Sequence, residues 1–180
     1  MITLPLFPLP ICLMPGGTTE LRIFEPRYQR LVKEASINGV GFGMCLFDTE
    51  HNQILNTGCV AKIIDFTQMK DGLLGITISG QQRFQLENFS VEADGLKRGQ
   101  VTLLPNWPTC AIANAEQQHI ADVLAPLLPN ASNSPQQLAE MSWICQRWLE
   151  LLPIDIRAKQ ELMRQPDAHM TQALLQQLIE

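Results

Sequence analysis

The sequence predicts an α+β protein whose first part is rich in strands and whose second part is helical. Up to residue 105, apolar residues mostly alternate with polar ones or form short runs between glycine-containing turns, which is typical of strands. Beyond the proline-rich stretch 105–108, apolar residues recur every three or four positions, which is typical of helices. We therefore expect a bent, barrel-like sheet of about six strands with one helix over residues 1–105. A bundle of four helices should follow over residues 109–180.

The N-terminal segment contains the clearest local signals. Leu4-Pro-Leu-Phe-Pro has the composition of a strand. Because proline cannot donate a backbone hydrogen bond, we expect an edge strand or an extended passage here and not a central strand. Pro15-Gly16-Gly17 is a turn sequence. Pro26 suits the first position of a helix and Asn38-Gly39 suits its end, so a helix is predicted from Pro26 to about Asn38.

Further strands are predicted from residue 42 onward. Alternating apolar residues that begin at Phe42 and at Leu74 indicate two of them. Residues 57–69 carry apolar side chains on both faces, so the strand that they form should be covered on both sides. Lys70-Asp71-Gly72 is the expected hairpin turn between the second and third of these strands.

The segment after this hairpin contains three features that should shape the sheet. Gly80 should permit a turn, and Arg83 should be held by an acidic side chain or by backbone carbonyls. The phase of the inward-facing residues slips by one near Glu87-Asn88, which predicts a β-bulge that bends the sheet.

Capping signals define the helical part. Asn114 with Gln117 precedes one helix, and residues 129–135 should be a polar connector. Ser134-Pro-Gln-Gln137 is a capping box that should start the strongest helix, and Asp155 and Asp167 should cap two short helices. The residues expected to face inward from these last three helices are Leu138, Met141, Cys145, Trp148, Leu149, Leu152, Leu162, Met163, Met170, Leu174 and Leu178.

Composition excludes several classes of protein. With 46% hydrophobic and 17% charged residues, the 180-residue chain is not intrinsically disordered. The net charge is −5 and neither part is basic, so a nucleic acid would have to bind a local patch. The five scattered cysteines indicate reduced, mostly buried thiols, and with no apolar run of about 20 residues and no signal-peptide pattern we expect a cytoplasmic protein.

Two blocks of motifs resemble a known family. The first comprises Leu4-Pro-Leu-Phe-Pro-Leu-Pro, Met14-Pro-Gly-Gly and Ile23-Phe-Glu-Pro-Arg-Tyr; the second comprises Gly58-x-x-Ala61-x-Ile63, Asp71-Gly72 and Gly80-x-x-Arg83-Phe84. Both resemble the substrate-binding (N-terminal) domain of Lon proteases, which also occurs alone in small bacterial proteins. The resemblance implies a PUA-like fold for the strand-rich part and a role in recognising protein.

The sequence lacks the common catalytic and metal-binding motifs. A G-x-x-x-x-G-K-[ST] phosphate-binding loop is absent, so we do not expect the ATPase activity of a full Lon protease, and its Ser–Lys peptidase region has no counterpart. C-x-x-C, H-E-x-x-H and acidic calcium-loop patterns are absent as well. We therefore expect no catalytic residue, no cofactor and no metal site.

The resulting hypothesis is a non-catalytic module that binds unfolded segments of other proteins, or one dedicated partner such as a protease or chaperone. A bulged sheet with proline-rich edges offers places where an extended peptide pairs by its main chain or fills apolar pockets. The predicted contact residues are Phe7, Leu9, Met14, Phe24, Arg27 and Phe42.

Two alternatives remain open from the sequence. RNA binding is the first, because barrel-like folds of this kind elsewhere bind RNA; the acidic balance and the single tyrosine argue against it. The second is a small-molecule hydrolase or carrier, which would need a deep pocket with converging polar groups.

Overall fold

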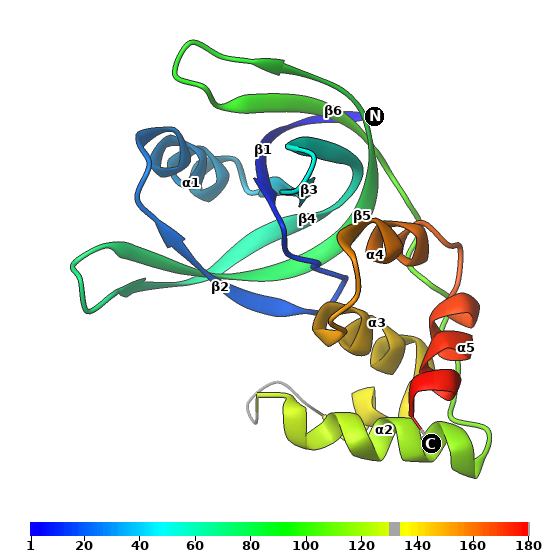
Figure 1. Ribbon diagram of the computed structural model, residues 1–180. Helices are drawn as coiled ribbons and strands as arrows, with labels where there is room; N and C mark the ends of the chain where they lie inside the picture. Colours follow the sequence, from blue (N-terminus) through cyan, green and yellow to red (C-terminus); the bar gives the residue numbers. More distant parts are fainter. Residues whose placement is uncertain (130–133, 180) are drawn as a thin grey trace. The chain divides into compact units, whose positions relative to one another are not determined.

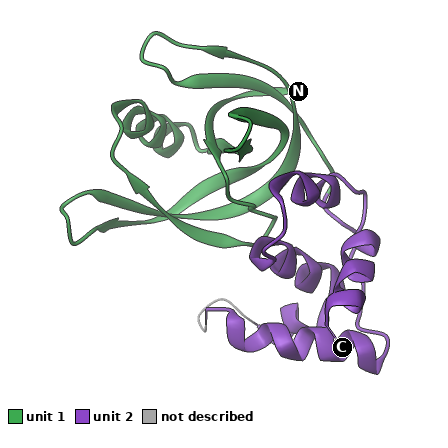
Figure 2. Cartoon of the chain, in the orientation of Figure 1, with its two compact units in different colours: residues 1–105 green, residues 106–180 purple. Residues whose placement is uncertain are grey.

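Within the described part of the chain, all strands lie in the first 105 residues. The computed structural model describes residues 1–129 and 134–179, and within them it has one six-stranded sheet and five α-helices (Figure 1). The chain divides into two compact units, Met1–Pro105 and Asn106–Glu180 (Figure 2). The predicted α+β class is confirmed.

The six strands pair in a circuit. They are β1 Ile2–Leu9, β2 Thr18–Ile23, β3 Phe42–Asp48, β4 Gln53–Gln68, β5 Leu74–Val91 and β6 Lys97–Leu103. The order across the sheet is β2-β5-β4-β3-β1-β6, and β5 also pairs with β6. Starting from β5, the strand pairing runs through β4, β3, β1 and β6 and then back to β5. Strand β2 pairs with β5 outside this circuit. Only the β1–β3 pair is parallel among the pairs of the described strands.

A bulge in β5 makes this circuit possible. Residues 74–85 of β5 face β4, and residues 84–91 face β6. The register with β6 shifts between Leu86 and Asn88, so the bulge predicted near Glu87-Asn88 is confirmed. Because a bulge bends its strand, one long strand can pair with two others that run in different directions.

The position predicted for the first strand is wrong. β1 is not an edge strand: it pairs with β6 through residues 2–6 and with β3 through residues 6–9. The two ladders occupy different halves of β1, so Pro5 and Pro8 each have a partner strand on one side only. A missing N–H is tolerated there because it can fall on the unpaired side.

The role predicted for Gly80 also differs from the one observed. Gly80 does not turn the chain but lies within β5, opposite Ala61 of β4. The Gly17 carbonyl accepts a hydrogen bond from its N–H, and the Gly80 carbonyl accepts one from the N–H of Gly16. A Cβ atom at position 80 would overlap the backbone carbonyl of Met14. Glycine is needed because another backbone segment approaches closely.

Helix α1, Pro26–Asn38, has the predicted bounds. Gly39 ends it in the left-handed conformation with φ 71°, as the Asn38-Gly39 signal indicates. Leu31, Val32 and Ala35 are buried in the core of the first unit, where they join apolar side chains from β2, β3, β4 and β5. The helix thus covers one face of the sheet.

The second unit contains four α-helices within the described residues. They are α2 Ala115–Leu124, α3 Met141–Leu151, α4 Ile156–Met163 and α5 His169–Leu178. Two tryptophans tie them together: the indole N–H of Trp107 donates to the Gln165 carbonyl at 2.7 Å, and that of Trp148 donates to the Ile120 carbonyl at 3.0 Å. The predicted cap of α2 is confirmed, because the Asn114 side chain accepts from the Gln117 N–H.

The helix predicted to begin at Ser134 starts later. The capping box forms, with Gln137 N–H donating to Ser134 Oγ at 3.2 Å, but it leads only into the 3₁₀ turn Gln137–Ala139. Glu140 is extended and starts α3 instead, since its carboxylate accepts the N–H groups of Ser142 and Trp143. Of the predicted connector, residues 130–133 lie outside the described part of the chain.

The inward face predicted for α5 is wrong. Thr171 and Leu175 are buried, whereas Met170 and Leu178 are 47% and 56% exposed and Leu174 is half-buried. The helix is short and apolar on two stripes, so its periodicity does not decide which stripe faces the core. The other stripe lies open and, with α4, borders a groove of about 570 Å³.

Substitution of Gly80 tests the close approach of Met14. Gly80→Ala should lower the free energy of unfolding by about 1–3 kcal/mol, because backbone must shift to admit the methyl group. The measurement is chemical denaturation. Gly75→Ala is the matched control in the same strand: its nearest new contact, at 3.1 Å, is the movable side chain of Met69. Equal stability of the two variants would contradict this account.

Candidate functional site

The outer half of β4 has a free edge. Strand β3 pairs with residues 53–61 of β4 and stops there, so residues 62–68 are paired with β5 alone. The expectation that this strand is covered on both faces holds for residues 57–61, which are buried, but is wrong for residues 64–68, which are all exposed. Backbone groups along such an edge are free to pair with a further strand.

The edge is partly blunted by its own sequence. The register between β4 and β5 shifts between Ile63 and Asp65, and the Asp65 carboxylate accepts a hydrogen bond from the Phe66 N–H at 2.9 Å. A bulge and an acidic side chain are common means of limiting uncontrolled strand pairing. A segment that pairs here must compete with the Asp65 carboxylate for the Phe66 N–H.

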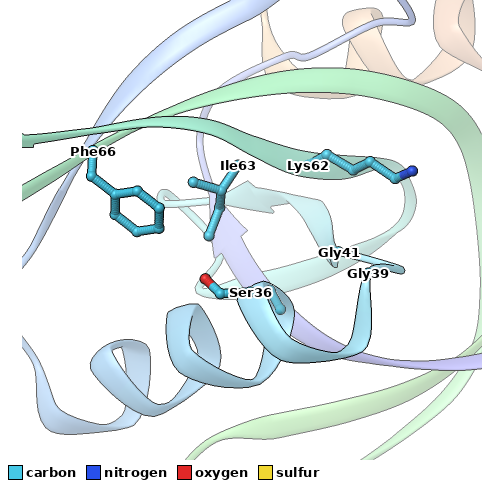
Figure 3. Close-up of a pocket in the computed structure, with 7 residues that line it drawn as sticks. Ser36, Gly39, Gly41, Lys62, Ile63 and Phe66 are labelled. Atoms are coloured by element: carbon cyan, nitrogen blue, oxygen red, sulfur yellow. The ribbon is translucent and has the colours of Figure 1, made fainter.

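Apolar side chains flank this edge. Ile64 and Phe66 are 58% and 52% exposed. Phe66 borders two hollows, one of about 230 Å³ against the end of α1 and one of about 350 Å³ beside the β4–β5 turn. Figure 3 shows the first, with Ile63 and Phe66 extending from β4 toward the last turn of α1 near Ser36. We refer to residues 62–68 with these two hollows as the β4 edge surface.

The six contact residues predicted from the sequence do not form one surface. Phe7, Met14 and Phe42 are buried, with at most 5% of each exposed, and so are not available to a ligand in this structure. Phe7 stacks on Tyr28 with ring centroids 3.9 Å apart. Leu9 is half-buried against the core, and Phe24 is 60% exposed between β2 and α1.

Arg27, the sixth, lies in a different groove. This groove, of about 430 Å³, is here called the Arg27–Lys97 groove, and its lining residues are Pro8, Arg27, Tyr28, Phe47, Asn52, Ile54, Phe89 and Lys97. The Arg27 guanidinium pairs with Glu25 at 2.7 Å, and this hydrogen bond raises the pKa of Arg27. Phe89, expected from the sequence to face inward, is instead 43% exposed, and nothing in the sequence pointed to Lys97. Strand pairing brings both residues to Arg27 from far along the chain.

An ion-pair cluster fixes α1 to the β5–β6 turn. Arg30 contacts Glu92 at 2.8 Å and Asp94 at 2.9 Å, and Arg98 contacts Glu92 at 2.9 Å and Glu34 at 3.0 Å. Hydrogen bonds from Arg98 and Arg30 hold the pKa of Glu92 below its ordinary value, and the Arg30 guanidinium does the same for Asp94. The start of α1, which carries Arg27, is thereby positioned on the sheet.

Arg83 is a buried residue that holds two parts of the first unit together. The side chain is 2% exposed and donates to the Pro105 carbonyl at 2.6 Å, which confirms the prediction that carbonyls hold it. Burial lowers the pKa of its guanidinium. Arg83 therefore ties β5 to the end of the first unit and does not face a ligand.

The other chemically reactive groups do not assemble into a site. All five cysteines are free and four are buried, as predicted, and burial raises the pKa of Cys45 and Cys145 to about 12. Among residues 1–129 and 134–179, no three His, Cys, Asp or Glu side chains gather as a metal centre would require. None of the helices in the described part of the chain is long and apolar enough to cross a membrane.

Comparison with known proteins gives the family. The family model of the ATP-dependent protease La (LON) substrate-binding domain matches residues 3–178. A Lon N-terminal domain protein from Xanthomonas campestris has a similar crystal structure, with a TM-score of 0.79 and 29% identity over 100% of both chains. The N-terminal domain of Mycobacterium avium complex Lon protease shares the fold, with a TM-score of 0.60 and 14% identity over 97% of this chain and 96% of that one.

Curated relatives agree with this assignment. Lon protease of Parabacteroides distasonis is 32% identical over 109 residues, which are 57% of this chain and 13% of the relative. Lon protease of Porphyromonas gingivalis is 28% identical over 100 residues, which are 52% of this chain and 12% of that relative. The chain thus matches about an eighth of those proteins' length. It belongs to the Lon substrate-binding domain family, and this module is neither the protease nor the ATPase domain.

Acidification should loosen the ion-pair cluster. In the folded protein, the pKa values of Glu92 and Asp94 lie below the ordinary values that they have in the unfolded chain. The two carboxylates therefore stabilise the fold fully at a pH above the ordinary pKa values, and this stabilisation is lost as the pH falls through the lower pKa values of the folded state. The free energy of unfolding should therefore fall between about pH 5 and pH 2, and it should fall less steeply in Glu92→Gln. Denaturation at a series of pH values measures this; identical slopes for the two proteins would contradict it.

Proposed function

We propose that this protein binds extended segments of unfolded or partner proteins along the β4 edge surface, without performing chemistry on them. The observation that carries the proposal is the free edge of residues 62–68, flanked by the exposed side chains of Ile64 and Phe66. A segment added there gains main-chain hydrogen bonds, and alternate side chains of the segment can enter the two hollows. Membership in a family of substrate-binding domains supports the same role.

The β2 edge at the other side of the sheet is a weaker candidate. Its exposed positions include Thr18, Glu20 and Arg22, and Arg22 is paired with Asp71. Charged side chains on an edge strand discourage the addition of another strand. The β4 edge carries apolar side chains instead, so it is the edge suited to an apolar segment.

Removal of the two exposed apolar side chains tests the proposal. A fluorescein-labelled, reduced and carboxymethylated unfolded protein serves as the probe, and fluorescence anisotropy measures its binding. Ile64→Ser with Phe66→Ser should weaken binding about tenfold, because about half of each side chain is still exposed and available for burial, worth about 1.4 kcal/mol in total. Because both residues are more than half exposed, thermal unfolding should change little.

Val91→Ser is the matched control. Val91 is a β5 residue of the same unit, is 59% exposed and lies outside the β4 edge surface. Its variant should bind like the wild type. Equal loss in both variants, or no saturable binding of the probe up to high micromolar concentration, would contradict the proposal. Binding of single-stranded RNA with an affinity that falls steeply as salt rises would support the RNA alternative.

A further inference from the structure

The Arg27–Lys97 groove has a composition unlike that of the whole chain. The protein carries 18 acidic and 13 basic residues, yet the groove is lined by two basic residues and no acidic one. The remaining walls are mainly apolar or aromatic, from Pro8, Phe47 and Phe89 among others. A groove of about 430 Å³ is within the range that holds a few side chains or a small ligand.

The two basic side chains differ in how their charge is balanced. Arg27 is held in place by Glu25 at 2.7 Å and reaches the Gly95 carbonyl at 3.4 Å, so its charge is largely compensated. Lys97 forms no ion pair with any acid of the described chain. The groove therefore presents one uncompensated positive charge beside apolar surface, and a carboxylate is complementary to it.

The aromatic wall is fixed before a ligand arrives. Tyr28 is stacked on buried Phe7 with an interplanar angle of 4°, and the Arg27 guanidinium lies 5.2 Å from the centre of the Tyr28 ring. Phe89, on β5, is 43% exposed and has surface left to bury. An aromatic or large aliphatic side chain thus has a preformed surface close to the cationic side chains.

We propose that the Arg27–Lys97 groove binds polypeptide segments in which an aspartate or glutamate lies next to an aromatic or large aliphatic residue. The acid pairs with Lys97 and its neighbour packs on Phe89 and Tyr28. A polypeptide suits the groove better than a free small acid, because Phe89 remains open to solvent and a small ligand would be only partly enclosed. This site is separate from the β4 edge surface, so it would add a sequence preference that strand pairing alone cannot supply.

Three labelled peptides test the charge preference. They share a Gly/Ser-rich sequence with an amidated end and differ only at the centre, which reads Phe-Asp-Leu, Phe-Asn-Leu or Phe-Lys-Leu. The wild type should bind the Asp peptide about three- to fivefold more tightly than the Asn peptide, as expected for one partly exposed ion pair. The preference should shrink as salt rises.

Variants of Lys97 assign that preference to the groove. Lys97→Met keeps a side chain of similar length without the charge, and should bind the Asp and Asn peptides equally. Lys97→Glu should invert the order, so that the Lys peptide binds best; this gain of binding cannot arise from misfolding. Lys33→Met, at an exposed lysine of α1 that lines neither this groove nor the β4 edge surface, should keep the wild-type preference.

Several results would overturn the proposal. They are equal binding of the Asp and Asn peptides by the wild type, an unchanged preference in Lys97→Met, and no binding of any peptide. Phenylacetate offers the ring and the carboxylate without a chain; displacement of the Asp peptide by phenylacetate at concentrations near the peptide's Kd would overturn the assignment to a polypeptide. Absence of a charge preference in the wild type, together with saturable binding of the unfolded probe, would contradict this proposal alone and leave the role of the β4 edge standing.

Discussion

The first unit depends on the pairing of β5 with three different strands. Its first part lies between β2 and β4, and beyond the bulge near Asn88 it pairs with β6. The hairpin of β4 and β5 extends beyond β3, because β3 begins at Phe42, which lies opposite Ala61 of β4. The same constraint that joins the strands into a circuit leaves residues 62–68 with one free edge, as the arm formed by β4, β5 and β2 shows in Figure 1.

Much of the fold could be predicted because local chemistry decided it. Pro26 and Gly39 bound α1, and the phase slip near Glu87 revealed the bulge. The features that were missed depend on tertiary pairing. Gly80 reads locally as a turn, but a distant carbonyl of Met14 requires it. The face of α5 that bears Met170 is as apolar as its buried face, so only packing could choose between them.

The candidate site was less predictable than the fold. Phe7 and Phe42 look like contact residues in sequence, yet large aromatics in a small α+β unit usually supply its core, and both are buried there. Phe66 was recognised as apolar on a strand, but its exposure depends on where β3 begins, at Phe42 opposite Ala61. Lys97 reaches Arg27 only through the pairing of β6 with β1 and β5. Such sites arise from the pairing of segments that are far apart in the chain, which local sequence patterns do not show.

The measurement that most directly tests binding at the β4 edge is a backbone amide chemical-shift titration of the ¹⁵N-labelled protein with an unfolded polypeptide. The account predicts that the largest changes fall on residues 62–68 and on the end of α1 near Ser36, with amides in residues 62–68 also becoming protected from hydrogen exchange. Changes confined to the second unit, or to the β2 edge, would contradict it.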